Sequence, residues 1–383
     1  MSSAPDKIMA WQMVQPAVRN KETGETTPGR LELVDLPVPE LKTGEALVKV
    51  AGCGLCHTDL GYFYDGVPTV CKPPLTLGHE ISGTVVAGDA AWIGKEVIIP
   101  AVMPCRQCLL CKTRRGNRCL SQKMPGNSLG IYGGFASHIP VPSVDLCEIR
   151  DRKGIPLEHL SVVADAVTTP FQAAKRASLD IGDNVIVIGI GGVGQYMVQT
   201  AKALGAGTVI AVAGTSQMSP KVGSPEYIAS TDEKLQKMKQ YGADFVINVA
   251  GKGPSDLAGE VKAIQKQNGL PVFGWKIFEA TGSSAGQDVA LTLLSFTGTL
   301  VVIGFGMGKV EYSLSRLMAF DAEIVGTWGC LPEYYPQVLE TVLAGKVSVG
   351  PFLQTRPMSS IREAFEEAHR KAPDKRIVLT PDF

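Results

Sequence analysis

The chain lacks an excess of charge of either sign. Its 383 residues contain 37 Lys and Arg and 37 Asp and Glu, so the formal net charge is zero at pH 7. Without a basic field, the surface has no electrostatic basis for binding nucleic acid or an anionic membrane. We therefore expect a small-molecule substrate and no polyanionic partner.

Long apolar runs are also missing. The longest, such as 185–188 and 300–303, have the length of a strand and are too short to span a bilayer. The N-terminal stretch MSSAPDKIMAWQMV has neither a basic segment nor a continuous apolar run before a cleavage site. These absences predict a cytoplasmic protein that has no membrane association and keeps its cysteines reduced.

Four of the nine cysteines lie close together, in the pattern Cys105-x-x-Cys108-x-x-Cys111-x7-Cys119. In a reduced chain this spacing indicates metal binding before disulfides. Four thiolates complete the tetrahedron of a structural zinc and leave no position for water. An iron–sulfur cluster is the chemical alternative. The spacing disfavours the third interpretation, that these are buried cysteines without a ligand.

A second group of metal-binding residue types precedes this run. Cys56 and His79 supply two candidate ligands, and each is followed by a carboxylate, Asp59 and Glu80. A catalytic zinc needs three protein ligands and one open position for substrate. The carboxylates are candidates to orient His79 or to tune the metal. The competing interpretation is that His79 is a core histidine with its hydrogen bonds satisfied.

The pattern of predicted elements changes along the chain. Up to about residue 144, short β-like segments broken by Gly and Pro include 46–50, 81–87 and 96–100. Later, strands alternate with helices. Strands are predicted at 184–189, 208–213, 245–248, 275–279 and 299–304, and helices at 193–204, 234–241 and 256–266. The alternation predicts an α/β protein with a Rossmann doubly wound parallel sheet at 166–329. We expect the first domain, 1–165, to be completed by 330–383.

A glycine motif follows the first strand of that second domain and opens a helix. It comprises Gly189, Ile190, Gly191, Gly192, Val193 and Gly194. In this context the first glycine makes the tight turn, the second lets the backbone approach a pyrophosphate, and the last allows close packing of helix and strand. The helix N-terminus offers free N–H groups to the phosphates. The motif therefore predicts a dinucleotide cofactor.

The expected acidic residue is absent from the end of the next strand. A carboxylate there normally holds the ribose hydroxyls of NAD, but the strand ends at Ala213 and a polar stretch resembling an insertion follows. Glu226, inside this stretch, is a candidate to replace the carboxylate. Alternatively, Thr215, Ser216 and Lys221 accept a 2′-phosphate and favour NADP. The sequence leaves both open.

Together these motifs show a family resemblance. Gly-x-Cys-His-Thr-Asp, Gly-His-Glu, the four-cysteine run and Gly-x-Gly-Gly-x-Gly stand in the order found in zinc-containing medium-chain alcohol dehydrogenases. The chain resembles that family over nearly its whole length. The resemblance implies a GroES-like β-rich catalytic domain, a Rossmann domain, one catalytic and one structural zinc, and NAD. The third ligand of the catalytic zinc would be Asp165, with Glu80 as a nearby ligand that alternates with water.

The resemblance also assigns roles around the metal and the cofactor. Thr58 matches the hydroxyl that contacts the substrate oxygen and begins the proton relay. His57 matches a cationic residue near the cofactor pyrophosphate, and Thr169 and Ile303 match cofactor contacts. Some members carry a relay histidine where this chain has Gly61, so the relay beyond Thr58 passes through the ribose hydroxyl or His57.

Within the family, three stretches point to a substrate class. The segments at 9–14, 61–66 and 124–128 are similar to dehydrogenases of alicyclic β-hydroxyacyl-CoA esters from anaerobic benzoyl-CoA degradation, which use NAD. The substrate implied is a ring alcohol, and its product is the 6-oxo compound. Arg114, Arg115 and Arg118 are candidates to hold CoA phosphates bidentately. The alternative is that they are solvated loop charges.

In the mechanism that this resemblance implies, zinc lowers the pKa of the substrate hydroxyl, Thr58 helps to remove the proton and hydride passes to the nicotinamide. Two other function classes compete with it. One is a zinc-free quinone or enoyl-CoA reductase with 1,4-hydride transfer, and the other is a non-catalytic nucleotide-binding redox sensor or structural protein. The family resemblance also implies a homotetramer or homodimer, with pairing through the stretch from 299–304 onward.

Overall fold

The computed structural model describes residues 5–20, 22–214, 224–370 and 374–383. The chain divides into two compact units. Unit 1 comprises Met1–Thr168, Gly329–Leu343 and Val349–Phe383, and unit 2 comprises Thr169–Trp328 and Ala344–Ser348. No helix in the described ranges is both long and apolar enough to cross a membrane.

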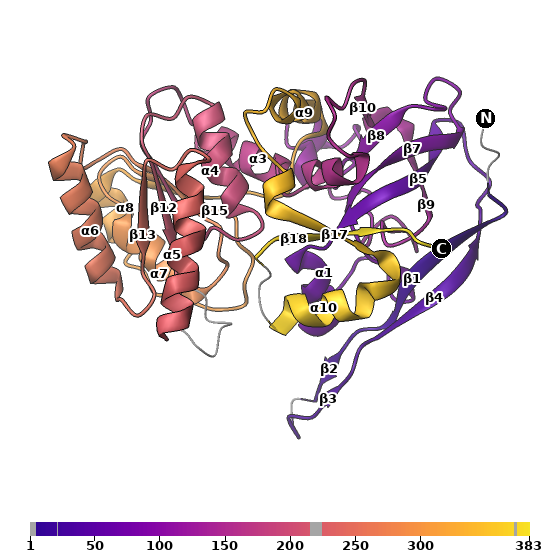
Figure 1. Cartoon of the computed structure of the whole chain (residues 1–383), viewed down its shortest axis with the longest axis horizontal. Coiled ribbons are helices and arrows are strands. Elements are labelled where there is room, and N and C mark those ends of the chain that lie inside the picture. Colours follow the sequence, from indigo (N-terminus) through magenta and orange to yellow (C-terminus); the bar gives the residue numbers. More distant parts are fainter. Residues whose placement is uncertain (1–4, 21, 215–223, 371–373) are drawn as a thin grey trace. The chain divides into compact units, whose positions relative to one another are not determined.

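Unit 1 is built around a sheet with the strand order β10-β8-β7-β5-β18-β17, in which β9 also pairs with β5 (Figure 1). These strands are β5 (Glu45–Gly54), β7 (Glu80–Gly88), β8 (Glu96–Ile99), β9 (His138–Pro142), β10 (Cys147–Ile149), β17 (Leu353–Pro357) and β18 (Arg376–Thr380). The segments predicted at 46–50, 81–87 and 96–100 are β5, β7 and β8. Because β18 pairs with β5 and β17, the C-terminal residues complete this sheet.

A smaller sheet in unit 1 has the order β4-β1-β6, and a separate pair joins β2 to β3. Their bounds are β1 (Lys7–Gln15), β2 (Val18–Arg19), β3 (Thr26–Thr27), β4 (Arg30–Pro37) and β6 (Leu75–Thr76). Helix α10 (Ile361–Arg370) buries one side, made of Ile361, Ala364, Phe365 and Ala368, at the spacing of an amphipathic helix. Phe365 meets Phe63 of α1 (His57–Tyr64) edge-on at 5.5 Å. The C-terminal helix therefore fixes the helix that begins beside Cys56.

Unit 2 contains a parallel sheet with the order β13-β12-β11-β14-β15-β16. Its strands are β11 (Val185–Ile188), β12 (Val209–Ala213), β13 (Phe245–Asn248), β14 (Lys276–Glu279), β15 (Thr299–Val302) and β16 (Glu323–Gly326). Its helices include α4 (Gly194–Ala203), α5 (Pro225–Lys239), α6 (Pro254–Gln267), α7 (Ser284–Leu293) and α8 (Ser315–Phe320). The strand order reverses between β11 and β14, which confirms the predicted Rossmann-type α/β fold.

Both faces of this sheet are covered, as an all-parallel sheet requires. Side chains alternate between the faces along a strand, so Ile186 and Ile188 share one face. They belong to a core cluster with Val261 of α6 and Val289 of α7. Val187, on the other face, has no exposed surface, and α4 contacts β11 and β12.

One detail of unit 2 corrects the sequence predictions. Helix α5 begins at Pro225, well before the helix expected at 234–241, because Ser224 caps it by accepting the N–H of Tyr227 and proline fits the first turn. The stretch interpreted as an insertion is thus helical in its second part. In the stretch from 299–304 onward, where pairing between copies is expected, β15 is paired on both sides and β16 lies at the edge of the sheet.

Candidate metal and cofactor sites

Four potential ligands meet in unit 1. One ligand atom each from Cys56, His79, Glu80 and Asp165 lies within 4.8 Å of the others. His79 Nε2 is 3.6 Å from Asp165 Oδ2, and Cys56 Sγ is 4.0 Å from the same oxygen. Zinc bonds of 2.0–2.3 Å in a tetrahedron place neighbouring ligand atoms about 3.3–3.8 Å apart. The group therefore fits a zinc ion with little adjustment.

Asp59 connects the segment that carries Cys56 with the segment that carries His79. Its Oδ2 accepts the N–H of Cys56 and its Oδ1 accepts the N–H of Gly78, both at 3.0 Å. The same Oδ1 lies 3.3 Å from His79 Nδ1. Burial favours the neutral imidazole, yet Asp59 and Asp165 hold the pKa of His79 well above its usual range. Asp59 thus positions His79 from behind and leaves Nε2 for the metal.

Glu80 makes a buried ion pair that sequence reasoning missed. Arg376, in β18, donates from Nε to Oε2 of Glu80 at 2.6 Å and from Nη2 to Oε1. Glu80 is fully buried and Arg376 nearly so. Burial raises the pKa of Glu80 to about 7, against the opposing effect of Arg376. Because the two residues are 296 positions apart, no local pattern could have predicted the pair.

The two other residues predicted around the metal are at the start of α1. Thr58 Oγ1 lies 3.7 Å from Cys56 Sγ and is partly exposed, so its hydroxyl borders the ligand group. His57 is the first residue of the helix and its side chain is exposed. The structure therefore brings Thr58 to the metal group and leaves His57 at the surface beside it.

The four-cysteine run forms the second ligand group, which we call the cysteine lobe (residues 105–119). Its sulfur atoms are separated by 3.5 Å (Cys108–Cys111), 3.7 Å (Cys108–Cys119) and 3.9 Å (Cys105–Cys111). Four thiolates around one zinc are about 3.8 Å apart. An iron–sulfur cluster would separate them further, because different iron atoms hold them. Backbone N–H groups lower the pKa of Cys105 to about 6, which favours the thiolate that zinc needs.

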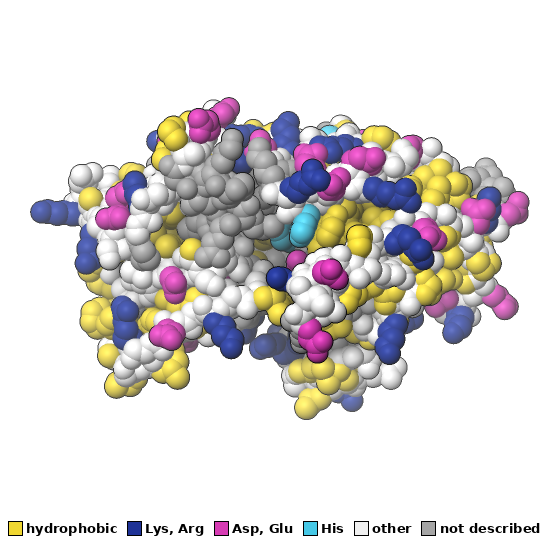
Figure 2. Space-filling model, turned by 90° about the horizontal axis from the view of Figure 1, so that it is seen from below, with side chains coloured by type: hydrophobic (Ala, Val, Ile, Leu, Met, Phe, Trp, Pro, Cys, Tyr) yellow, Lys and Arg dark blue, Asp and Glu magenta, His cyan; other side chains and the backbone are white. Residues whose placement is uncertain are grey.

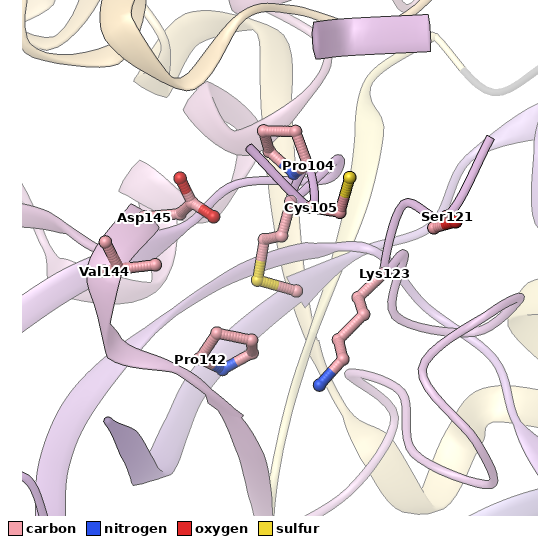
Figure 3. Close-up of a pocket in the computed structure, with 8 residues that line it drawn as sticks. Pro104, Cys105, Ser121, Lys123, Pro142, Val144 and Asp145 are labelled. Atoms are coloured by element: carbon pink, nitrogen blue, oxygen red, sulfur yellow. The ribbon is translucent and has the colours of Figure 1, made fainter. Parts of the chain in front are cut away.

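A small pocket borders the cysteine lobe (Figure 3). Cys105, Ser121 and Lys123 line it on the lobe side, and Pro142 at the end of β9 and Asp145 in the segment after β9 line it on the other. Arg106 pairs with Asp145 and so ties the lobe to that segment. Cys105 is thus partly accessible from this pocket, whereas Cys119 is fully buried.

The arginines proposed for CoA lie on the outside of the lobe. Arg114, Arg115 and Arg118 are all exposed. On the face that Figure 2 shows, basic and acidic side chains are scattered among one another. This distribution agrees with the zero net charge and offers no broad basic field.

The glycine turn of unit 2 is tightly packed at Gly189 and Gly194 and has free space beside Gly191 among the described residues. Gly189 ends β11 at φ +88°, and a Cβ on Gly194 would lie 1.7 Å from the Gly189 carbonyl oxygen. Gly191 is exposed, and a Cβ there would meet no described heavy atom within 4 Å. Gly192 and Val193 follow it and lead into α4. This shape suits a pyrophosphate resting on the turn at the helix N-terminus.

The remaining predicted cofactor residues are also in unit 2. Glu226 is exposed in the first turn of α5, where hydrogen bonding to backbone N–H lowers its pKa. Thr215, Ser216 and Lys221, the residues predicted to accept a 2′-phosphate, lie outside the described residues.

Thr169 lies in the first turn of α3 (Thr168–Arg176). Ile303 follows β15 and is partly buried, and its N–H donates to the carbonyl oxygen of Glu279 at 2.8 Å. Ile303 is therefore at the carboxyl edge of the sheet, where open α/β sheets bind ligands.

Gly191→Ala tests the open part of the turn. Because the new methyl group meets no described atom, we expect the melting temperature to stay within about 2 °C of the wild type. The methyl group instead occupies the space that the pyrophosphate needs, so the Kd for NAD(P)H should rise at least about tenfold. Fluorescence titration measures it. Equal affinity in wild type and variant would show that the turn does not hold the cofactor.

Comparisons with known proteins place these sites in one family. The alcohol dehydrogenase GroES-like domain model matches residues 42–151, and the zinc-binding dehydrogenase model matches residues 226–344. The chain is 29% identical to an alcohol dehydrogenase of Geobacillus stearothermophilus, covering 91% of this chain and 95% of that one. It is 28% identical to a sorbitol dehydrogenase of Rattus norvegicus, with 90% and 91% covered. A thermostable alcohol dehydrogenase structure from Pyrobaculum aerophilum shares the fold, with a TM-score of 0.78, 24% identity, and coverage of 98% and 100%.

The chain therefore belongs to the zinc-containing medium-chain alcohol dehydrogenase family. It is an NAD(P)-dependent zinc enzyme that acts on CH–OH groups, and its two ligand groups account for two zinc ions. The sequence also allowed a purely structural or sensory role. Because the chain is an enzyme that acts on alcohols, that alternative is not needed to explain its two sites.

Proposed function

We propose that this enzyme oxidises the ring alcohol of 6-hydroxycyclohex-1-ene-1-carbonyl-CoA to the 6-oxo compound with NAD. The observation that carries the proposal is the similarity of the segments at 9–14, 61–66 and 124–128 to dehydrogenases of such CoA esters. The exposed Arg114, Arg115 and Arg118 offer guanidinium groups suited to phosphates of the CoA chain.

In the proposed site, Cys56, His79 and Asp165 hold the catalytic zinc, while Arg376 neutralises Glu80 beside it. A zinc ion bound there supplies Lewis acidity toward an alcohol oxygen, and NAD(P) accepts the hydride. Thr58 takes the hydroxyl proton, since its Oγ1 borders the ligand group at 3.7 Å from Cys56 Sγ. Exposed His57 follows it on the route to solvent.

Thr58→Val tests the proton route. Valine keeps the shape of threonine but has no hydroxyl to pass a proton, so we expect kcat to fall by about 10²-fold. The zinc content should stay at two per chain, because Thr58 is not a proposed ligand. Two controls accompany this measurement: the substrate deuterium isotope effect, and kcat of Thr58→Ser. Because serine keeps the hydroxyl group, Thr58→Ser should restore most of the rate. Full activity of Thr58→Val would exclude this hydroxyl from the relay.

For the cofactor, we propose that Glu226 replaces the acidic residue missing after Ala213. Its place in the first turn of α5 puts a carboxylate on the helix that follows β12. Glu226→Gln should weaken NAD by about 1 kcal/mol through loss of charged hydrogen bonds, and leave NADP unchanged. Steady-state KM values for both cofactors measure this. A parallel change for both would show that Glu226 does not select the cofactor.

A substrate panel tests the proposal directly. It compares the CoA ester, the corresponding free acid, cyclohexanol and sorbitol, each with NAD and with NADP. We expect the highest kcat/KM with the CoA ester and NAD. Preference for sorbitol would support the second candidate, a polyol dehydrogenase, which is favoured by the sorbitol dehydrogenases among the relatives. Changing Arg114, Arg115 and Arg118 together to Gln should raise the KM of the CoA ester alone.

We also propose that the enzyme is a homodimer or homotetramer joined through the edge strand β16. Among the described residues of unit 2, exposed apolar side chains accompany this edge, including Ile324, Trp328 and Met318. An unpaired edge strand with apolar neighbours favours pairing with a second copy. Light scattering of wild type and Ile324→Lys measures the oligomeric state, and an unchanged mass would place the interface elsewhere.

A further inference from the structure

Asp165 is held differently from the other two proposed ligands. Cys56 and His79 are fixed through the bonds of Asp59 to the neighbouring backbone. Asp165 instead follows a 3-10 helix at residues 157–164 and ends it at φ −144°, ψ −57°. A helix terminus leaves backbone carbonyl groups unpaired unless other groups donate to them. The carbonyl groups of Ala164 and Asp165 lie at such a terminus.

Two hydroxyl groups satisfy these carbonyls. Tyr335, the first residue of α9 (Tyr335–Leu343), donates its hydroxyl to the carbonyl oxygen of Ala164. Thr168 Oγ1 lies 3.2 Å from the same oxygen and 3.4 Å from the carbonyl oxygen of Asp165. Both side chains are fully buried, so water does not compete for these bonds.

The Tyr335 hydroxyl also accepts a hydrogen bond. The N–H of Ala101, two residues after β8, donates to it at 3.1 Å. One phenolic oxygen thus links the sheet of unit 1 to the turn that carries Asp165. The link comes from the segment Gly329–Leu343, which returns to unit 1 after the chain has passed through unit 2.

From this geometry we infer that Tyr335 is a positioning residue for the catalytic metal, acting through the backbone of Ala164 to hold the Asp165 carboxylate in place. The inference rests on the proposed role of Asp165 as a zinc ligand. Partners behind the ligands orient a metal site as the ligands do, and their loss costs metal affinity. Tyr335 itself touches neither metal nor substrate in this role.

Tyr335→Phe in the full-length zinc enzyme tests the inference. It removes only the bridging oxygen. Zinc transfer to an excess of a coloured chelator is followed over time, and Cys56→Ala identifies which phase belongs to the catalytic site. We expect the catalytic phase to accelerate by about 10–100-fold, with the structural phase from the cysteine lobe unchanged. The visible absorption band of enzyme with cobalt(II) at the catalytic site should shift as well.

Two further variants give the test its controls. Thr168→Val removes the second donor to the same turn and should also accelerate the catalytic phase. If Tyr335→Phe does not fold, the result with Thr168→Val decides the question. Tyr132→Phe makes the same chemical change where the ring packs on the strand-rich core of unit 1, and should behave as wild type. An unchanged catalytic phase, or equal acceleration of both phases, would overturn the inference.

Asp165→Ala separates this inference from the proposal beneath it. If Asp165→Ala keeps its catalytic zinc as tightly as wild type, the proposed ligand set is wrong and the role of Tyr335 falls with it. If Asp165→Ala loses that zinc while Tyr335→Phe and Thr168→Val retain it, the ligand set stands and only the positioning role is wrong.

Discussion

Cys56→Ala should abolish nearly all dehydrogenase activity while leaving the protein folded. Zinc polarises the alcohol oxygen, and losing about 4 kcal/mol of this stabilisation corresponds to roughly a thousandfold in kcat/KM. Without the Cys56 sulfur, His79 and Asp165 are the remaining proposed ligands, because Glu80 is already paired with Arg376. Two ligands are too few for a tight zinc site. Metal analysis should therefore find one zinc per chain in place of two, retained by the cysteine lobe.

The matched control is Cys147→Ala, which removes another buried thiol of unit 1 that belongs to neither ligand group. Burial raises the pKa of Cys147 to about 12, so its thiol is neutral near pH 7. Its variant should keep two zinc ions and wild-type turnover. Full activity of Cys56→Ala with one zinc bound would contradict the proposed mechanism.

Arg376→Met should produce the largest loss of stability. The change removes the guanidinium that donates to both carboxylate oxygens of fully buried Glu80, and breaking one side of a buried pair costs about 3–5 kcal/mol. Without the guanidinium, the pKa of Glu80 rises above its present value of about 7, so the carboxyl becomes neutral near pH 7 and the cost lies toward the lower figure. The urea midpoint of unit 1, followed by tryptophan fluorescence, measures the effect.

Arg356→Met provides the comparison for this variant. Arg356 lies on the neighbouring strand β17 and pairs with Glu367 at 2.7 Å, but both side chains are partly exposed. Solvent screening limits such a pair to about 1 kcal/mol or less. Equal destabilisation by both variants would mean that burial of the Glu80 pair has no special cost.

The fold could be predicted because its signals are local. Apolar strands, a glycine turn and amphipathic helices repeat along the second half of the chain, and each is read within about fifteen residues. The prediction failed where tertiary context decides. The start of α5 depends on a Ser224 cap and Pro225 inside a stretch of loop-like composition. The edge of the sheet depends on whether 323–326 forms a further strand, which the sequence alone had not indicated.

The residues of the site also divide into those that local motifs predict and those that depend on tertiary contacts. Cys56, His79 and the four cysteines of the lobe occur in compact motifs, and the structure brings each set together. Arg376 and Tyr335 were missed because each acts on a residue far away in sequence, at separations of 296 and 171 positions. Such contacts arise only after the C-terminal segments have returned to unit 1, and no spacing rule encodes them.

The position of Arg376 in the last strand separates the parts of the sequence on which the two ligand groups depend. The cysteine lobe draws all its ligands from fifteen consecutive residues, so a single loop supplies the whole set. In the sheet of unit 1, by contrast, β18 pairs with β5 and brings Arg376 to Glu80 from 296 positions away in the sequence. The ligand set of the structural zinc is therefore local in the sequence, whereas the surroundings of the catalytic ligand group depend on the C-terminal strand.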